Sequence, residues 1–419
     1  MTTIRGRFFS LTEPGKSFII RDTARKHFRH YVEINLFEDS HGAQVFRDVD
    51  TVDKFHLALS LVAGKELGSG KEDTIVFLDE IQEHGKLLPL LKFINQDGRY
   101  RYIASGSALG VELSRTSSIP MGSITIAKLF PLDFEEFLWA AGVAKDLIAY
   151  LRSLFKEGKE VDDAIHTVMM AHLRTYLLTG GLPAAVRLHF EGSSIDTVRK
   201  LHTEILAFYA ADCAKYDSGH RLQIMRIYRM LPSFMEQRKK RIVYKKIDQK
   251  SARADRYADE FDYLSACGVA LPALAVSNPI FPLLESATKN LLKLYLNDVG
   301  LLSAQFFADN VRPVLEDVPS VNLGSLYETF VAMELSAHSH HLFYYDNREK
   351  GEVDFLINDY DNLCILPIEV KSGRDWQIHS SLTRMVTEGA RKGIVLCNSN
   401  KARHREGITY LPVYMAAFL

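Results

Sequence analysis

The sequence predicts a multidomain α/β protein. Its 419 residues are long enough for several domains at roughly 100–200 residues each. Strand-like and helix-like runs alternate over residues 7–140 and again over 321–419, which is typical of parallel strands covered by helices. From Pro131 to about Met230, apolar residues instead recur at helical spacing. We therefore expect two α/β parts with a helical region between them.

The elements of these parts follow from local patterns. In the first part, short runs rich in β-branched and aromatic residues predict strands, and an amphipathic run predicts a helix. The strands are expected at 7–11, 31–35, 74–78 and 102–104, and the helix at about 17–28. In the last part we expect helices at 325–338 and 381–391, and strands at 341–345, 353–357, 363–370 and 393–397. The proline-rich run 271–282 predicts a turn-rich connection.

The composition is that of an ordinary globular protein. Hydrophobic residues make up 47% and charged residues 25%, which excludes disordered, collagen-like and coiled-coil classes. The 51 Lys and Arg balance the 52 Asp and Glu, so a nucleic-acid surface must be local. The sequence has no apolar leader segment, no long apolar stretch and no closely spaced cysteines. We expect a cytoplasmic protein without a zinc site or a membrane partner.

A nucleotide site is predicted where Gly15-Lys16-Ser17 follows a strand and opens a helix. In that setting backbone amides and a lysine cradle phosphates, and the hydroxyl binds Mg²⁺. Asp79, 63 residues after Lys16, ends an apolar strand and is placed to hold Mg²⁺, and Glu80 is placed to orient the attacking water. The alternative is that Asp79 and Glu80 only cap the next helix.

Two serines extend this site. Ser105 and Ser107 follow the next strand, where hydroxyls are placed to sense a γ-phosphate. The complete phosphate-loop pattern has glycine where this chain has Ser10, and Pro14 removes one amide from the loop. If the chain turns at Ser10, its Cβ strains the loop, so ATP binding could be weakened or lost.

A second cluster of chemical groups lies near the carboxyl end of the chain. Asp354 is followed 15 residues later by Glu369-Val370-Lys371 on another predicted strand. Alternate residues of a strand share a face, so Glu369 and Lys371 point together. Two carboxylates would hold Mg²⁺ while the lysine assists phosphodiester cleavage. The alternative is a salt-bridged strand edge.

A basic segment stands out from the neutral chain. Residues 212–257 hold 13 Lys or Arg against five Asp or Glu, a difference of about +8. Basic turns beside a helix suit a winged-helix module whose lysines meet DNA phosphates. A solvated surface is the alternative. The candidate nucleic-acid residues are Arg238, Lys239, Lys240, Arg241, Lys245, Lys246, Arg253 and Arg256.

Five ordered motifs resemble those of a prokaryotic family of AAA+-type ATPases that carry a C-terminal domain of the restriction-endonuclease-like, PD-(D/E)xK class. The motifs lie at Thr12–Ser17, Phe77–Gln82, Ala104–Ser107, Pro131–Phe137 and Gly180–Pro183. The resemblance implies four regions: an AAA+/P-loop ATPase core with a parallel sheet at 1–140, a helical lid at 141–225, a winged-helix-like basic region at 226–312 and a nuclease-like α/β domain at 313–419.

The resemblance also implies a further metal ligand, and it has departures. Glu328, 26 residues before Asp354, resembles the helix glutamate of resolvase-type members, and Glu334 on the same helix is expected at the surface. The family usually has a basic residue where Ser123 stands, and Arg115 is the nearest substitute.

The predicted function is an ATP-binding, DNA-associated ATPase with Mg²⁺-dependent nuclease potential. ATP and Mg²⁺ are the expected cofactors, DNA is the expected macromolecular partner, and a homo-oligomer is left open. The alternative is a non-catalytic module, in which a degenerate phosphate loop and an idle nuclease fold serve nucleotide sensing or binding to DNA or protein. A third reading is an inactive relic whose true start lies upstream.

Overall fold

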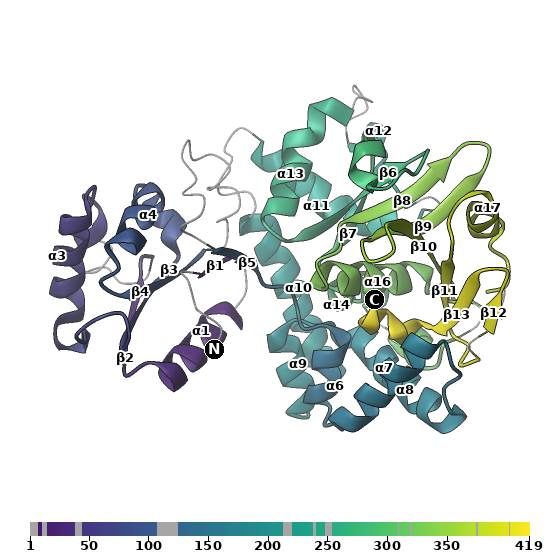
Figure 1. Cartoon of the computed structure of the whole chain (residues 1–419), viewed down its shortest axis with the longest axis horizontal. Helices are drawn as coiled ribbons and strands as arrows, with labels where there is room; N and C mark the ends of the chain where they lie inside the picture. The colour runs from purple at the N-terminus through teal and green to yellow at the C-terminus, as the bar shows by residue number, and fades with distance from the viewer. Residues whose placement is uncertain are drawn as a thin grey trace. The chain divides into compact units, whose positions relative to one another are not determined.

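The computed structural model describes two compact units (Figure 1). One comprises Met1–Leu129 with Ala266–Gly268, and the other comprises Phe130–Ser265 with Val269–Leu419. The described residues are 7–10, 15–37, 44–106, 125–212, 220–237, 240–247, 254–308, 310–318, 321–373, 376–401 and 403–419. Within them, every helix is too short or too polar to span a bilayer. The finer boundaries at 140, 225 and 312 stay predictions.

The first unit is built on a parallel sheet in the order β2-β3-β4-β1-β5. Its strands are β1 (Arg7–Ser10), β2 (His30–Asn35), β3 (Thr74–Asp79), β4 (Arg101–Gly106) and β5 (Thr125–Lys128). Its helices are α1 (Gly15–His27), α3 (Val52–Ala63) and α4 (Leu87–Asp97). The parallel α/β sheet predicted from the alternating pattern is confirmed. The strand β4 lies between β1 and β3, so the ends of all three meet at one edge.

Helices cover both faces of this sheet because side chains of each strand alternate. On β3, Ile75 and Phe77 pack against Ile20 of α1. Val76 and Leu78 point the other way, into the core formed with α3 and α4. The strand is therefore buried on both sides, which is why its sequence is a continuous apolar run.

The second unit contains a mixed sheet in the order β12-β13-β11-β10-β9-β8-β6-β7. Its strands are β6 (Ala270–Val276), β7 (Ala287–Leu296), β8 (Leu342–Asn347), β9 (Gly351–Asp359), β10 (Cys364–Val370), β11 (Gly393–Cys397), β12 (Arg403–Arg405) and β13 (Ile408–Pro412). The pairs β6–β8, β10–β11 and β11–β13 are parallel, and the other neighbours are antiparallel.

Helices fill the rest of this unit. The longer ones are α6 (Phe134–Ala140), α7 (Lys145–Glu157), α8 (Asp163–Thr179), α9 (Pro183–Phe190), α10 (Ile195–Asp212), α11 (Arg221–Met235), α13 (Ala258–Ala266), α14 (Val299–Phe306), α16 (Gly324–Ala337) and α17 (Ser380–Glu388). Two single turns are α12 (Tyr244–Ile247) and α15 (Arg312–Leu315). The sheet packs against α16 through β6, β7, β8 and β10, and against α17 through β9, β10 and β11.

The turn-rich connection predicted at 271–282 is wrong in its first half, because β6 occupies it. Pro272 lies in this strand, opposite Leu294 of β7. The pairing with β8 begins one residue later, at Ala273, so the missing proline amide falls outside that ladder. The order α11, α12, α13 and then the hairpin β6–β7 is compatible with a winged helix, but the hairpin also extends the sheet of β8–β13.

Glu334 is fully buried, which corrects the expectation of a surface position. Its Oε1 accepts a hydrogen bond of 2.9 Å from the backbone amide of Phe134, at the start of α6. Burial raises the pKa of this carboxyl well above its usual range, and the nearby Asp133 adds to the shift. The first backbone amides of a helix have no acceptor within that helix, and Glu334 supplies one for the start of α6. This contact accounts for its buried position.

The Gly180-Gly181 motif fits closely around Asp298. The chain leaves α8 at Gly180 with φ 70° and ψ −170°, and the amide of Gly181 donates to Asp298 Oδ2 over 2.7 Å. Asp298 also caps α14 through the Leu301 amide, and burial raises its pKa to about 6. A Cβ on Gly180 would lie 2.0 Å from Asp298 Oδ1. This motif is therefore required for packing.

We predict that Gly180→Ala destabilises the protein far more than Gly142→Ala. Both glycines have positive φ, 70° and 76°, so both substitutions carry a backbone cost of at least about 1 kcal/mol, and this cost is larger at Gly180, whose ψ of −170° is open almost only to glycine. Only Gly180 adds the overlap with Asp298, because nothing lies within 4 Å of a Cβ on Gly142. The free energy of unfolding from urea titration should fall by more than about 3 kcal/mol for Gly180→Ala. Equal losses in the two variants would contradict the packing role.

Candidate functional site

The predicted nucleotide residues meet at the carboxyl edge of the first unit's sheet. The helix α1 begins at Gly15, so Lys16 and Ser17 lie in its first turn, where backbone amides point outward. The residues that end β3 and β4 lie at the same edge because the strands are parallel. Lys16 is buried. Ser107, Arg115 and the loop residues 11–14 lie outside the described residues.

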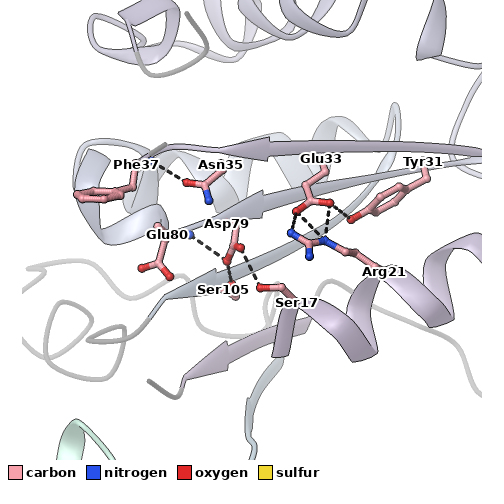
Figure 2. Close-up of polar contacts among 9 residues, drawn as sticks. All are labelled: Ser17, Arg21, Tyr31, Glu33, Asn35, Phe37, Asp79, Glu80 and Ser105. Atoms are coloured by element: carbon pink, nitrogen blue, oxygen red, sulfur yellow. Dashed lines mark hydrogen bonds and ion pairs between the residues drawn. The ribbon is translucent and has the colours of Figure 1, made fainter. Parts of the chain in front are cut away.

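The carboxylate of Asp79, at the end of β3, joins β4 and the helix α1 at this edge (Figure 2). Ser17 Oγ donates to Asp79 Oδ2 over 2.9 Å, and Ser105 Oγ donates to Asp79 Oδ1. Asp79 is only 4% exposed, and Ser105 is fully buried. The structure thus brings together Ser17, Asp79 and Ser105, as the sequence predicted, and a hydroxyl beside a carboxylate is the oxygen donor set that Mg²⁺ prefers.

Glu80 has an unusual backbone conformation directly after Asp79. Its φ of 55° and ψ of 45° are left-handed, which is uncommon for a residue with a Cβ. Its carboxylate accepts a hydrogen bond from Gln82 Nε2 and makes no capping bond to the turn that follows. The side chain of Glu80 therefore does not cap the following helical turn, in contrast to the helix-cap alternative. Strained backbone of this kind clusters at functional sites.

Ser10 is the last residue of β1 and does not lie in a turn. It pairs with Gly106 of β4 and with Lys128 of β5 in parallel registers. Extended backbone is open to serine, so the strain expected from a missing glycine does not arise at this residue.

A network that the sequence analysis missed holds α1 against β2. Arg21 Nε donates to both oxygens of Glu33, at 2.8 and 2.9 Å, and Tyr31 donates to Glu33 Oε2 over 2.7 Å (Figure 2). Burial alone would raise the pKa of Glu33, but the hydrogen bonds from Arg21 and Tyr31 outweigh it and lower the pKa. Arg21 is one turn after Ser17, so the network fixes the helix that carries the candidate phosphate-binding residues.

The acid cluster of the second unit lies between α16, β9 and β10. Lys371, the residue directly after β10, has its Nζ 2.7 Å from Oε1 of Glu369 on β10, so the two side chains point together, as predicted. Asp354 Oδ2 accepts a hydrogen bond of 2.8 Å from the Val370 amide. Glu328, on α16, is 4% exposed and Glu369 is 8% exposed.

Charge accumulates in this cluster. Burial raises the pKa of Asp354 well above its usual range, and the charges of Glu328 and Glu369 add to the shift. Burial also raises the pKa of Glu369, against the opposing charge of Lys371. Close carboxylates of this kind need cations nearby.

Two further lysines, neither of which was predicted to lie in this cluster, supply positive charge. Lys240 Nζ forms an ion pair with Glu328 Oε1. Lys293 on β7, 1% exposed, lies 2.6 Å from Glu352 Oε1. Its signal in the sequence is a lysine inside the apolar run of a strand, where a charge needs a partner.

The described residues include no group of three His, Cys, Asp or Glu side chains arranged to hold a metal ion. The set Glu328, Asp354 and Glu369 therefore differs from the expected three-ligand arrangement, and Glu328 is paired with Lys240. The donors themselves still suit a cation. Glu328 Oε2 and Glu369 Oε2 are both buried without a hydrogen-bond partner.

The basic segment is divided between internal and exposed residues. Lys240 forms an ion pair with Glu328, and Arg241 Nη1 lies 2.7 Å from Asp346 Oδ2. The exposed members are Lys245, Lys246 and Arg256, and Arg238, Lys239 and Arg253 lie outside the described residues. Because Lys240 and Arg241 pair with carboxylates of the same unit, the basic surface predicted from the sequence carries less unpaired positive charge.

The comparison with solved structures gives weak global matches. Hsp104 with ATPγS and FITC casein is 15% identical, with 65% of this chain and 48% of that chain covered and a TM-score of 0.28. Cdc6p from Pyrobaculum aerophilum is 12% identical, with 74% and 88% covered and a TM-score of 0.27. The ADP form of the Aeropyrum pernix ORC2 protein is 13% identical, with 74% and 87% covered and a TM-score of 0.30. This chain thus spans about half of the Hsp104 chain, and superpositions this poor assign no function.

Family models match three successive segments. Residues 170–311 and 323–416 match two domains of unknown function, DUF8612 and DUF4143. No curated protein matches the chain. Residues 13–138 match the model of an AAA domain. The segment that contains Lys16, Ser17 and Asp79 is accordingly similar to an AAA domain.

Proposed function

We propose that the chain is an AAA+-type ATPase that binds ATP and Mg²⁺ at the Asp79 edge and carries a Mg²⁺-dependent phosphodiesterase site in its second unit, acting on DNA. The observation that carries the first part is the Ser17–Asp79–Ser105 hydrogen-bond group at the strand ends of an AAA domain. The acid cluster with its unpaired buried oxygens supports the second part.

At the nucleotide site each residue has a separate task. The first turn of α1 offers amides and the Lys16 ammonium to phosphate oxygens. Ser17 and Asp79 would hold Mg²⁺, which neutralises phosphate charge when bound. Glu80 orients the attacking water, and its left-handed backbone points its carboxylate away from the Asp79 network. Ser105 keeps Asp79 in place from the neighbouring strand, and Ser107 is proposed to sense the γ-phosphate.

We predict that Lys16→Ala weakens ATP binding at least tenfold, because it removes the charge that faces the phosphates. Glu80→Gln should bind ATP like the wild type and hydrolyse it about 100-fold more slowly, since only water activation is lost. Calorimetry measures the affinity, and phosphate release measures the rate.

The control is Lys26→Ala, on the same helix. Lys26 is exposed and pairs with Asp22, so ATP affinity should stay unchanged. If Lys16→Ala binds ATP as tightly as Lys26→Ala, the nucleotide site is not at this edge.

In the second unit, Asp354 and Glu369 would hold Mg²⁺, with Glu328 in support. The ion would supply charge neutralisation and a more acidic water when bound. Lys371 is held by Glu369 at 2.7 Å, and its proposed task is to stabilise the charge of the phosphate to be cleaved. The non-catalytic alternative keeps this fold and uses it only for binding.

We predict that Asp354→Asn and Glu369→Gln lose Mn²⁺ binding and DNA cleavage together. Lys371→Met should keep Mn²⁺ binding and lose only the cleavage rate, because the lysine is not a metal ligand. Calorimetry with Mn²⁺ and gel assays on single-stranded, duplex and branched DNA, with RNA as a control, separate the two effects. The exposed Glu388→Gln is the matched control. A wild type that cuts none of these substrates would favour the non-catalytic module.

DNA contact is proposed through the exposed part of the basic segment. We predict that Lys245→Gln with Lys246→Gln lowers the log–log salt slope of duplex binding by about 1.8, because each lost phosphate contact removes about 0.9. Neutralising Arg241 instead should change the slope less, since its charge is paired with Asp346. Fluorescence anisotropy between 50 and 200 mM salt measures both, and an unchanged slope in the double variant would return the segment to a solvated surface.

A further inference from the structure

The contact between Lys240 and Glu328 joins two segments with different predicted roles. Lys240 comes from the basic segment between α11 and α12, and Glu328 comes from α16, next to the acid cluster. Lys240 has a positive φ of 47°, and its neighbours tie the segment down: the Lys240 amide donates to Gln237 O, and the Ile242 amide donates to Leu292 O of β7. The contact is therefore built into the fold.

The ammonium of Lys240 lies beside the start of α16, and the side chain is partly buried. A Cβ on Gly324, at the start of α16, would lie 3.6 Å from Lys240 Nζ and 3.7 Å from Ser372 Oγ, so the lysine ends between α16 and the residue after Lys371. Its partner Glu328 is 4% exposed, and the second oxygen of that carboxylate has no hydrogen-bond partner. The ammonium of Lys240 thus contacts only one of the two oxygens of the buried Glu328 carboxylate.

The lysines and carboxylates of the site nearly balance. Lys371 pairs with Glu369, Lys293 pairs with Glu352 and Lys240 pairs with Glu328. Asp354 has no ion-pair partner in this set and accepts a backbone hydrogen bond. A divalent cation that bound Asp354, Glu369 and Glu328 would lie close to the ammonium of Lys240 at Glu328, and the repulsion between the two cations would weaken metal binding at that carboxylate.

We propose that Lys240 is an internal counter-ion that competes with a divalent metal ion for Glu328. This inference rests on the proposed metal site at Asp354 and Glu369. With Lys240 in place, the metal is held by Asp354 and Glu369 and binds weakly. When the ammonium of Lys240 is removed from Glu328, this carboxylate becomes a ligand and the metal binds tightly. Lys240 thus sets the metal affinity of the second unit.

The test is Mn²⁺ binding by the full chain, measured by calorimetry and by the loss of the free Mn²⁺ resonance signal. Lys240→Met should bind Mn²⁺ at least about tenfold more tightly than the wild type. Lys350→Met is the matched control, because it also removes one lysine from a Lys–Glu pair, with Glu388 at 2.5 Å, and should leave the affinity unchanged.

A double-mutant cycle assigns the gain to Glu328. Glu328→Gln should change Mn²⁺ affinity less than threefold when Lys240 is present and lower it at least tenfold in the Lys240→Met background. Equal effects in both backgrounds, or no gain in Lys240→Met, would overturn the competition while leaving the metal site intact. If no protein in the series binds Mn²⁺, the metal site itself is wrong and the inference falls with it.

Folding is checked separately, because Lys240→Met leaves Glu328 without its counter-charge. Circular dichroism establishes that each variant is folded, and Lys240→Gln, which keeps a donor for Glu328, is the second variant. Mn²⁺ should raise the melting temperature of both Lys240 variants more than that of the wild type. An equal rise in all three proteins would contradict the competition.

Discussion

A buried carboxylate is stable only when donors or cations surround it, and this constraint shapes both units of the protein. Asp79 is held by the hydroxyls of Ser17 and Ser105, Asp298 by the amides of Gly181 and Leu301, and Glu334 by an amide at the start of α6. In each case the carboxylate joins segments that are far apart in the sequence. These contacts tie strand ends and helix starts into fixed positions, so candidate chemistry and fold depend on the same interactions.

The two candidate sites meet the constraint in different ways. At the nucleotide edge, the Asp79 carboxylate accepts hydrogen bonds from the neutral hydroxyls of Ser17 and Ser105, which do not cancel its charge. In the acid cluster, lysines are paired with the carboxylates. The first arrangement suits an ion that arrives together with phosphates. The second suits a site whose cation affinity is adjustable, because Lys240 pairs with Glu328, a carboxylate that a metal ion would otherwise contact.

Much of the fold followed from the sequence because its strands are short apolar runs with clear periodicity. The strands β1 to β4 and the group formed by Ser17, Asp79 and Ser105 were predictable, since parallel strand ends meet at one edge. The pairing of Glu369 with Lys371 followed from strand alternation.

Contacts between distant segments could not be predicted in the same way. Lys240 and Glu328 are 88 residues apart, and no periodicity relates them. The position of Glu334 in the sequence of α16 does not distinguish it from a surface glutamate. Its burial is explained by the backbone amide at the start of α6, to which it is bonded. Pro272 favoured a turn, but the pairing of β6 with β8 begins at Ala273, so the missing proline amide lies outside the β6–β8 hydrogen-bond ladder.

The shared sheet of the second unit also bears on where the chain can be divided. The strand β8 pairs with β9 on one side and with β6 on the other, although β6 lies before the boundary expected near residue 312. A fragment that began at that boundary would lack β6 and β7 and would expose the backbone donors and acceptors along β8. Such an open strand edge invites pairing with another copy of the fragment. The sheet, rather than the chain order, therefore defines the smallest piece of this unit that can be handled as a separate body.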